Sequence, residues 1–253
     1  MYRHKHHEES VEKMVEHYKQ DKAIQALFLV GSVATQTERP DSDLDGVAVV
    51  DSETLQKKRA EGALAEVIHG KCTYEGGYFD VSYMDKESLK KLITEGSEPM
   101  RNKFNCARVL FCDDDELVKI VEQIPTFPQE KKEEMQKKFY CTFKQFHRYF
   151  WNACKPTGFM RHHVAQGMVF NLYRLILLEN DLLFPSMRML EDAVIRAENK
   201  PAAIVEQSHN FLKTMTDEDA QKLIDSYESW TKYEYPTEHK IIMNGFSNPL
   251  EWF

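Results

Sequence analysis

The stretch Leu27–Val50, LFLVGSVATQTERPDSDLDGVAVV, decides how this chain folds. An apolar run that ends at Val30 predicts a buried strand, and Gly31 ends that strand. The polar residues 35–42 predict a loop, because they combine proline, aspartate and serine. A second apolar run, 44–50, is rich in valine and predicts another strand. The stretch therefore predicts two strands joined by a Gly-Ser bend and a polar loop.

Two acidic residues, Asp43 and Asp45, open the second predicted strand. Side chains alternate along a strand, so both carboxylates are expected on one face, with Leu44 on the other. Two carboxylates this close repel each other unless a cation lies between them. Oxygen ligands of this kind suit Mg²⁺, which also binds phosphate oxygens of a substrate. The alternative is a polar turn that precedes a strand.

A third acidic residue, Asp80, lies within the apolar segment 78–84, YFDVSYM. The period of two places Phe79 and Val81 on one face and Asp80 on the other. An aspartate in the middle of an apolar strand is costly unless it has a partner. We therefore expect Asp80 to complete a metal site with the other two carboxylates. Asp85 is expected instead to cap the helix that follows.

The Gly31-Ser32 pair is the candidate phosphate site. Glycine lets the backbone approach a ligand closely. Ser32 offers a hydroxyl and an N–H group at the start of a helix or turn, where a phosphate is favoured. The alternative is that Ser32 caps a helix and uses the same N–H groups.

The chain is expected to be an α+β protein with two domains, a sheet-containing domain over 1–125 and a helical bundle over 126–253. Pro125 and Pro128 bracket the predicted linker. In the first domain the patterns predict helices at 9–21, 53–64, 86–94 and 113–122, and strands at 78–84 and 109–112. Beyond the linker they predict helices at 135–150, 161–180 and 217–232, and helices that begin at Pro185 and Pro201.

Composition and charge argue against several classes of protein. The net charge of −8 argues against nucleic acid as the main partner. No apolar run approaches the roughly 18 residues that span a membrane, and the N-terminus lacks a signal-peptide pattern, so a cytoplasmic protein is expected. The five cysteines include no CxxC pair and predict reduced thiols.

Three histidines near the N-terminus, His4, His6 and His7, are interpreted as an incidental cluster at a frayed, solvated end, with a functional site that binds a metal as the alternative. Arg101 and Lys103 precede the predicted strand 109–112. They are expected in a solvated loop, with contact to triphosphate oxygens as the alternative.

The pattern of apolar strand, Gly-Ser, a loop of ten residues and Asp-x-Asp resembles the DNA polymerase β-like nucleotidyltransferase superfamily. The third carboxylate on a later strand fits the same pattern. Within that superfamily, the helical second half resembles the small antibiotic nucleotidyltransferases that act on aminoglycosides and lincosamides. The resemblance at the level of individual residues covers Leu27–Val50 and Asp80. The rest of the chain is similar in architecture only.

This resemblance implies a role for each matching residue. Gly31 and Ser32 would hold the β- and γ-phosphates of a nucleoside triphosphate. Asp43 and Asp45 would bind one or two Mg²⁺ ions, and Asp80 would complete the metal site or take the proton from an acceptor hydroxyl. Ser42 matches a position where relatives often contact the nucleotide.

One position departs from the pattern of the family. Several aminoglycoside-modifying relatives carry an arginine three residues after the serine, where this chain has Thr35. Arg39 in the same loop is the candidate substitute, and it is assigned to nucleotide binding.

The implied function is transfer of a nucleoside monophosphate, with AMP from ATP as the first choice, to a hydroxyl of a small molecule resembling an aminoglycoside. Pyrophosphate would be released. The alternatives are a nucleotidyltransferase that modifies another protein and a non-catalytic nucleotide-binding module. The expected partners are a nucleoside triphosphate and a small-molecule acceptor, with no nucleic acid and no membrane, and with a homodimer left open.

Overall fold

The computed structural model describes residues 2–237, which form two compact units that meet in the chain between Thr126 and Phe127. In the first unit, the helices are α1 (Lys5–Tyr18), α2 (Gly31–Thr35), α3 (Ser52–Ala60), α4 (Lys86–Glu95), α5 (Glu98–Lys103) and α6 (Asp115–Gln123). Its strands are β1 (Ile24–Val30), β2 (Leu44–Val50), β3 (Ala65–His69), β4 (Tyr78–Met84) and β5 (Arg108–Cys112). The expected α+β class is confirmed.

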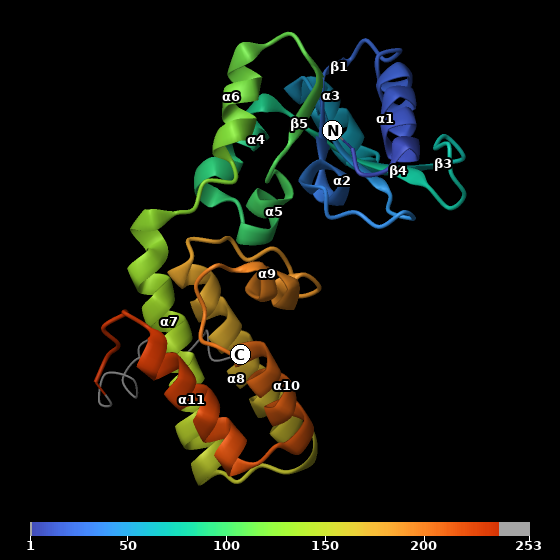
Figure 1. Ribbon diagram of the computed structural model, residues 1–253. Coiled ribbons are helices and arrows are strands. Elements are labelled where there is room, and N and C mark those ends of the chain that lie inside the picture. The colour runs from blue at the N-terminus through green and yellow to red at the C-terminus, as the bar shows by residue number, and fades with distance from the viewer. Residues whose placement is uncertain (1, 238–253) are drawn as a thin grey trace. The chain divides into compact units, whose positions relative to one another are not determined.

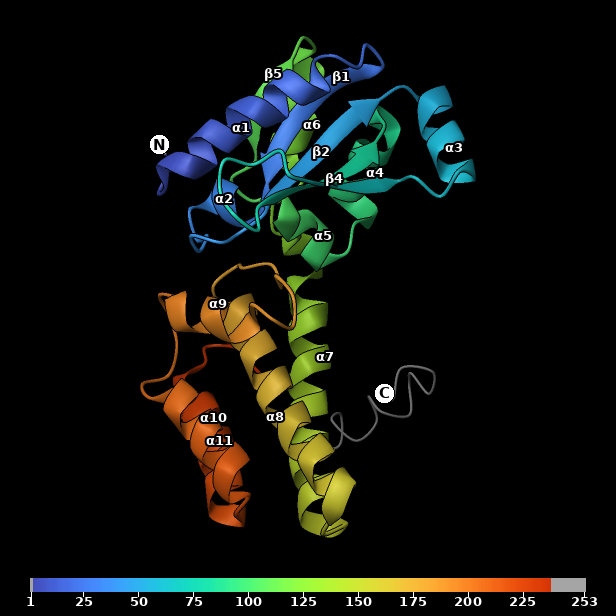
Figure 2. The ribbon, with the colours of Figure 1, turned by 90° about the vertical axis from the view of Figure 1, so that its right-hand side faces the viewer.

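The five strands form one mixed sheet in the order β3-β4-β2-β1-β5. Strands β2 and β4 pair in parallel, and the other three pairings are antiparallel. The two strands that carry the acidic residues are therefore direct neighbours near the middle of the sheet (Figure 2).

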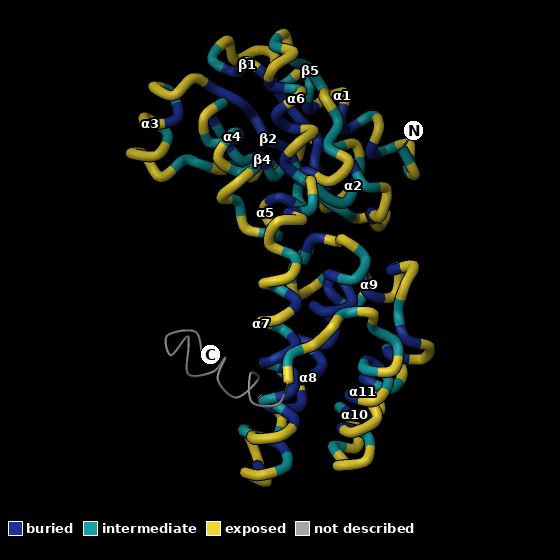
Figure 3. Tube along the Cα trace, turned by 90° about the vertical axis from the view of Figure 1, so that its left-hand side faces the viewer, coloured by how far each residue is buried: buried dark blue, intermediate teal, exposed yellow. Residues whose placement is uncertain are grey.

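Helices cover both faces of this sheet (Figures 1 and 2). Helix α1 lies on one face, where Met14 packs with side chains such as Leu27 and Phe79. Helices α4 and α6 lie on the other face, where Leu89 packs with side chains such as Phe28. Because both faces are covered, β1 and β2 are buried along almost their whole length, as Figure 3 shows.

Strands β2 and β4 have the bounds that the sequence predicts, whereas β3 and α5 were not expected. Strand β3 is a short edge strand whose residues alternate between exposed and half-buried positions. It therefore lacks the apolar run by which β1 and β2 are recognised. Helix α5 has only six residues and begins beside Pro99, so it offers little periodicity.

The second unit is helical within the described residues 127–237. Its elements are a 3₁₀ turn (Gln129–Lys131), α7 (Lys132–Gln145), a π-helix (Phe146–Ala153), α8 (Gly158–Glu179), α9 (Leu190–Arg196), α10 (Ile204–Thr214) and α11 (Asp217–Trp230). Helices α7 and α8 run side by side, and α10 pairs with α11 (Figure 1). The buried side chains of these helices form one core.

Three expectations for this unit need correction. The helix predicted over 135–150 changes to a π-helix at Phe146, at the point where the Phe146 ring lies on Gly167 of α8. A β-carbon at Gly167 would be 2.2 Å from Phe146 Cε1, so a larger residue there would force the Phe146 ring to move. The helices predicted to begin at Pro185 and at Pro201 begin at Leu190 and at Ile204 instead. No helix among residues 2–237 is both long and apolar enough to cross a membrane.

Candidate functional site

Three carboxylates meet at one edge of the first unit. Asp43 directly precedes β2, Asp45 lies within β2, and Asp80 lies within β4. One oxygen from each carboxylate lies within 4.8 Å of the other two. All three side chains are partly exposed, so a solute can reach them.

The sheet register brings these residues together. Asp45 of β2 is the direct partner of Asp80 on the neighbouring parallel strand β4. Partners on adjacent strands point to the same face, and Asp43 precedes Asp45 by two residues and shares that face. The sequence predicts the shared face of Asp43 and Asp45, but the pairing of Asp45 with Asp80 depends on the parallel contact between β2 and β4.

Gly31 packs directly against the side chain of Asp45. Its φ angle is +70°, a conformation that favours glycine. A β-carbon at this position would be 2.1 Å from Asp45 Oδ2 and 2.7 Å from Asp45 Cγ. The carboxylate therefore occupies the space that any other side chain at residue 31 would fill.

The donor set fits a hard divalent cation. Three oxygen ligands that lie within 4.8 Å of one another repel when ionised, and a bound cation would remove that repulsion. Mg²⁺ prefers carboxylate oxygens and keeps further positions for water and phosphate oxygens. Among residues 2–237, this is the one group of three or more histidine, cysteine, aspartate or glutamate side chains close enough to share an ion.

Tyr78, the first residue of β4, belongs to this site and was not among the residues predicted from the sequence. Its hydroxyl donates a hydrogen bond to Asp43, which raises the pKa of Tyr78. The ring of His69, its partner on β3, lies 5.2 Å from the Tyr78 ring. A signal was available, because Tyr78 precedes Asp80 by two residues and so shares its face.

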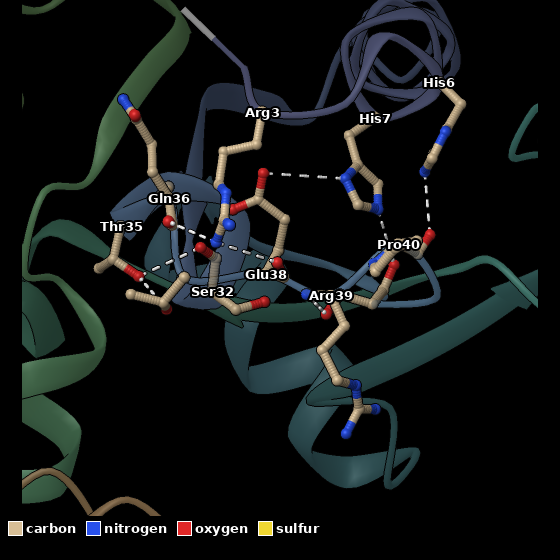
Figure 4. Close-up of polar contacts among 12 residues, drawn as sticks. Arg3, His6, His7, Ser32, Thr35, Gln36, Glu38, Arg39 and Pro40 are labelled. Carbon is tan, nitrogen blue, oxygen red and sulfur yellow. Dashed lines mark hydrogen bonds and ion pairs between the residues drawn. The ribbon is translucent and has the colours of Figure 1, made fainter. Parts of the chain in front are cut away.

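The short helix α2 carries the Gly31-Ser32 pair. The Oγ1 atom of Thr35 donates toward the carbonyl oxygens of Gly31 and Ser32, both at 3.1 Å. Val30, not Ser32, is the residue that precedes the helix. The capping role considered for Ser32 is therefore wrong, and Thr35 is engaged within α2 (Figure 4).

The loop between α2 and β2 holds the other two predicted nucleotide contacts. The guanidinium group of Arg39 pairs with Asp41 at 3.0 Å, and its side chain is 77% exposed. Figure 4 shows it extending away from Ser32 and Thr35. The Ser42 hydroxyl accepts a hydrogen bond from the Arg39 backbone N–H at 3.0 Å. Both side chains thus have partners within their own loop.

Arg101 was expected in a solvated loop, and this expectation is wrong. It belongs to α5 and is buried. Its guanidinium group donates to the carbonyl oxygens of Ile124, at 2.9 Å, and of Thr126. Arg101 therefore ties α5 to the end of the first unit, which removes it as a candidate phosphate ligand.

The expectation of a frayed, solvated histidine cluster is also wrong for His7. Helix α1 begins at Lys5, and the His7 side chain is fully buried. His6 and His7 contact the carbonyl oxygens of Pro40 and Ser42 (Figure 4). The N-terminal turn of α1 therefore lies against the loop that leads to Asp43.

A separate polar cluster lies inside the helical unit. Lys144 and Tyr140 both donate to Glu228 Oε1, at 2.5 and 2.6 Å. The buried His147 ring lies beside Asn152, and burial together with the positive charge of Lys144 lowers its pKa from 6.5 to about 4. Every charge in this cluster has a partner on a neighbouring helix, so we assign the cluster to structure.

With this geometry established, residues 8–106 match a family model described as a nucleotidyltransferase domain. Residues 8–106 are a nucleotidyltransferase domain. The match contains Gly31, the three carboxylates and Tyr78, and the helical second unit lies outside it. The resemblance noted from the sequence is thereby confirmed for the domain. Domains of this class transfer a nucleoside monophosphate to an acceptor.

Among solved structures, the chain is similar to a nucleotidyltransferase-like protein from Exiguobacterium sibiricum 255-15. The two are 12% identical with a TM-score of 0.43, and the similarity covers 97% of this chain and 77% of that one. No curated protein matches the chain in sequence.

Proposed function

We propose that the protein transfers a nucleoside monophosphate from a nucleoside triphosphate, with ATP as the first choice, to a hydroxyl group of a small molecule. One observation carries the proposal. Asp43, Asp45 and Asp80 bring their oxygens within 4.8 Å of one another beside Gly31, inside a nucleotidyltransferase domain. An acidic triad on a nucleotidyltransferase domain is what a metal-dependent transfer needs.

The three carboxylates are the proposed ligands of Mg²⁺, which when bound would neutralise negative charge on the triphosphate. Gly31 leaves room for the Asp45 carboxylate beside the start of α2, and its backbone N–H is a candidate contact for the phosphates. Ser32 supplies a hydroxyl and an N–H group on the same turn. The main contribution of the chain is to hold and orient the reactants.

In the proposed reaction, the acceptor oxygen forms a bond to the α-phosphorus of the triphosphate. The bond from that phosphorus to the oxygen bridging the β-phosphate breaks, and pyrophosphate leaves. The hydroxyl proton passes to a base or to water. We assign Asp80 to the metal because its oxygen lies within 4.8 Å of both other carboxylates. If Asp80 were instead the base, Asp80→Asn would flatten the acid limb of the pH–rate profile.

The net charge of −8 favours an acceptor that carries positive charge, because an acidic protein attracts cations. Aminoglycoside-like molecules combine several hydroxyl groups with protonated amines and fit this requirement. This chemistry supports a cationic, polyhydroxylated small molecule as the acceptor, with Arg39 and Ser42 left as candidate contacts to the nucleotide.

The test is incubation of the purified full chain with triphosphates labelled at the α-phosphorus, Mg²⁺ and a panel of aminoglycosides, lincosamides and neutral polyols. We expect label on a cationic hydroxylated acceptor, together with release of pyrophosphate. Label on a protein from a lysate would show protein modification instead. Triphosphate binding without pyrophosphate release would indicate a non-catalytic binding module. Parallel reactions with each nucleotide would identify the preferred base.

A matched pair of variants links the activity to the site. Asp45→Asn removes one ligand charge while it keeps the size of the side chain. Asp41→Asn makes the same change on an exposed residue of the neighbouring loop. We expect transfer to be lost in Asp45→Asn and retained in Asp41→Asn, and equal activity of the two would contradict the metal assignment.

A further inference from the structure

The loop of residues 36–42, which leads to Asp43, is held by the N-terminal segment of the chain (Figure 4). Carbonyl oxygens at alternate positions of this loop face side chains of that segment. Arg3 Nη1 donates to Gln36 O at 3.3 Å and to Glu38 O at 3.5 Å, and the Nε2 atoms of His6 and His7 contact Pro40 O at 2.9 Å and Ser42 O at 3.2 Å. The loop is thus fixed from outside, by a regular set of contacts to its backbone.

The contact of His7 with the Ser42 carbonyl is the one that bears on Asp43. The Ser42 carbonyl belongs to the peptide unit that precedes Asp43, so its direction fixes where the Asp43 backbone begins. Two donors hold it, His7 Nε2 at 3.2 Å and the Tyr74 hydroxyl at 2.5 Å. A carbonyl oxygen has two lone pairs, and both are used here.

The chemistry of the contact identifies the tautomer of His7. A carbonyl oxygen only accepts hydrogen bonds, so His7 Nε2 must carry the proton. The ring is fully buried and packs near the rings of His6 and Tyr74, with centroid distances of 4.4 and 5.0 Å. These contacts hold the ring in the orientation from which Nε2 reaches Ser42.

The other side of the His7 ring shows that the residue does not serve packing alone. His7 Nδ1 lies 4.0 Å from Glu38 Oε1, too far for a hydrogen bond. Among the described residues, His7 Nδ1 and both carboxylate oxygens of Glu38 are buried and have no hydrogen-bond partner. Burial without a partner costs free energy. An apolar residue would therefore stabilise this position better, unless the contact to Ser42 has a function.

We propose that His7 is a positioning residue for Asp43. Together with Tyr74, it holds the Ser42 carbonyl so that the Asp43 carboxylate meets Asp45 and Asp80 in the geometry that a divalent cation needs. The proposal rests on the proposed metal-dependent function. It adds a residue outside the acidic triad, on a helix that contributes no ligand.

Two substitutions of His7 separate the hydrogen bond from the rest of the ring. In His7→Gln the amide nitrogen reaches the place of Nε2 and can still donate to Ser42. In His7→Asn the shorter side chain places its polar atoms near Nδ1, so the donor to Ser42 is lost. Tyr74→Phe removes the second donor and keeps the ring. His17→Asn is the control. His17 lies near the other end of α1 from His7, where it contacts the Tyr18 ring.

The readout is binding of Mn²⁺ alone to the full chain, followed by electron paramagnetic resonance, so that no turnover is needed. We expect binding to weaken about three- to tenfold in His7→Asn and in Tyr74→Phe, the range for loss of one hydrogen bond. His7→Gln and His17→Asn should stay within about twofold of the wild type. In the transfer assay, the weakened variants should recover their kcat at high Mg²⁺.

The outcomes separate this proposal from the proposed function. If the wild type binds Mn²⁺ and His7→Asn and Tyr74→Phe bind it equally well, the positioning role is wrong and the function stands. If these variants only unfold at a lower temperature while their Mn²⁺ affinity is unchanged, His7 is structural. If the wild type itself binds no Mn²⁺, the metal-dependent function fails, and the positioning role fails with it.

Discussion

The α-carbon of Gly31 lies directly against the carboxylate of Asp45, so that a β-carbon at residue 31 would be 2.1 Å from Asp45 Oδ2. The first residue of α2 and the β2 carboxylate of the acidic triad therefore depend on each other. The positive φ angle of Gly31, +70°, adds a second requirement for glycine at the same position.

The chain offers a matched control for Gly31, because Gly62 has the same φ of +70° and no atom near its missing β-carbon. Both Gly31→Ala and Gly62→Ala should lose about 1 kcal/mol of stability from the strained backbone. Only Gly31→Ala should also lose nucleotidyl transfer, by about a hundredfold, because the Asp45 carboxylate is displaced. Thermal unfolding and transfer assays measure the two effects, and equal activity in both variants would contradict the contact.

The repulsion among the carboxylates gives a prediction for Asp43→Asn. Without metal, removing one charge should leave the folded state as stable as the wild type or more stable, since like charges no longer face each other. With Mg²⁺ at ten times its dissociation constant, the wild type should gain about 1.4 kcal/mol and the variant nothing. Unfolding in urea with and without Mg²⁺ measures this. Asp41→Asn should respond to Mg²⁺ as the wild type does.

Arg101 is predicted to matter for stability and not for nucleotide binding. Arg101→Met leaves the buried carbonyl oxygens of Ile124 and Thr126 without their donor. The free energy of unfolding should fall by about 2–4 kcal/mol, whereas Lys103→Met on the same helix should change it by about 0.5 kcal/mol or less. ATP affinity, measured by calorimetry, should be unchanged in both. A loss of affinity without a loss of stability would restore Arg101 as a phosphate ligand.

The buried His147 leads to a prediction of how the stability of the helical unit depends on pH. Its pKa is lowered from 6.5 to about 4, mainly by burial, so in acid the unfolded chain takes up a proton before the folded chain does. Stability is therefore complete above pH 6.5 and is lost as the pH falls toward 4. The wild type should lose about 2–3 kcal/mol more than His147→Gln between pH 7 and pH 4.5. Urea unfolding at both pH values tests this, and parallel losses would show that the histidine is already charged in the fold.

The local sequence pattern was sufficient to predict the two strands that carry acidic residues. The valine-rich run 44–50 and the alternating segment 78–84 predict β2 and β4 with their observed bounds. Alternation also places Asp43 and Asp45 on one face, because the side-chain period of a strand does not depend on what surrounds it. The same reasoning would have selected Tyr78, which shares the face of Asp80.

Other features follow from contacts between distant parts of the chain. Strand β3 is an edge strand with a weak apolar pattern, and it forms because β4 offers it a pairing partner. The burial of Arg101 depends on the end of α6, and the burial of His7 depends on the 36–42 loop. No local window of sequence contains both members of these contacts.

By itself, the sequence determined the class of fold, the two strands of the site and the three acidic residues, because strand periodicity and turn chemistry act over neighbouring residues. Tertiary structure alone decided that Asp45 stands beside Asp80, that Gly31 lies under Asp45, and that His7 and Tyr74 hold the residue before Asp43. These relationships arise when segments far apart in the chain pack together. Their geometry is therefore a property of the folded sheet and its covering helix, and not of any one segment.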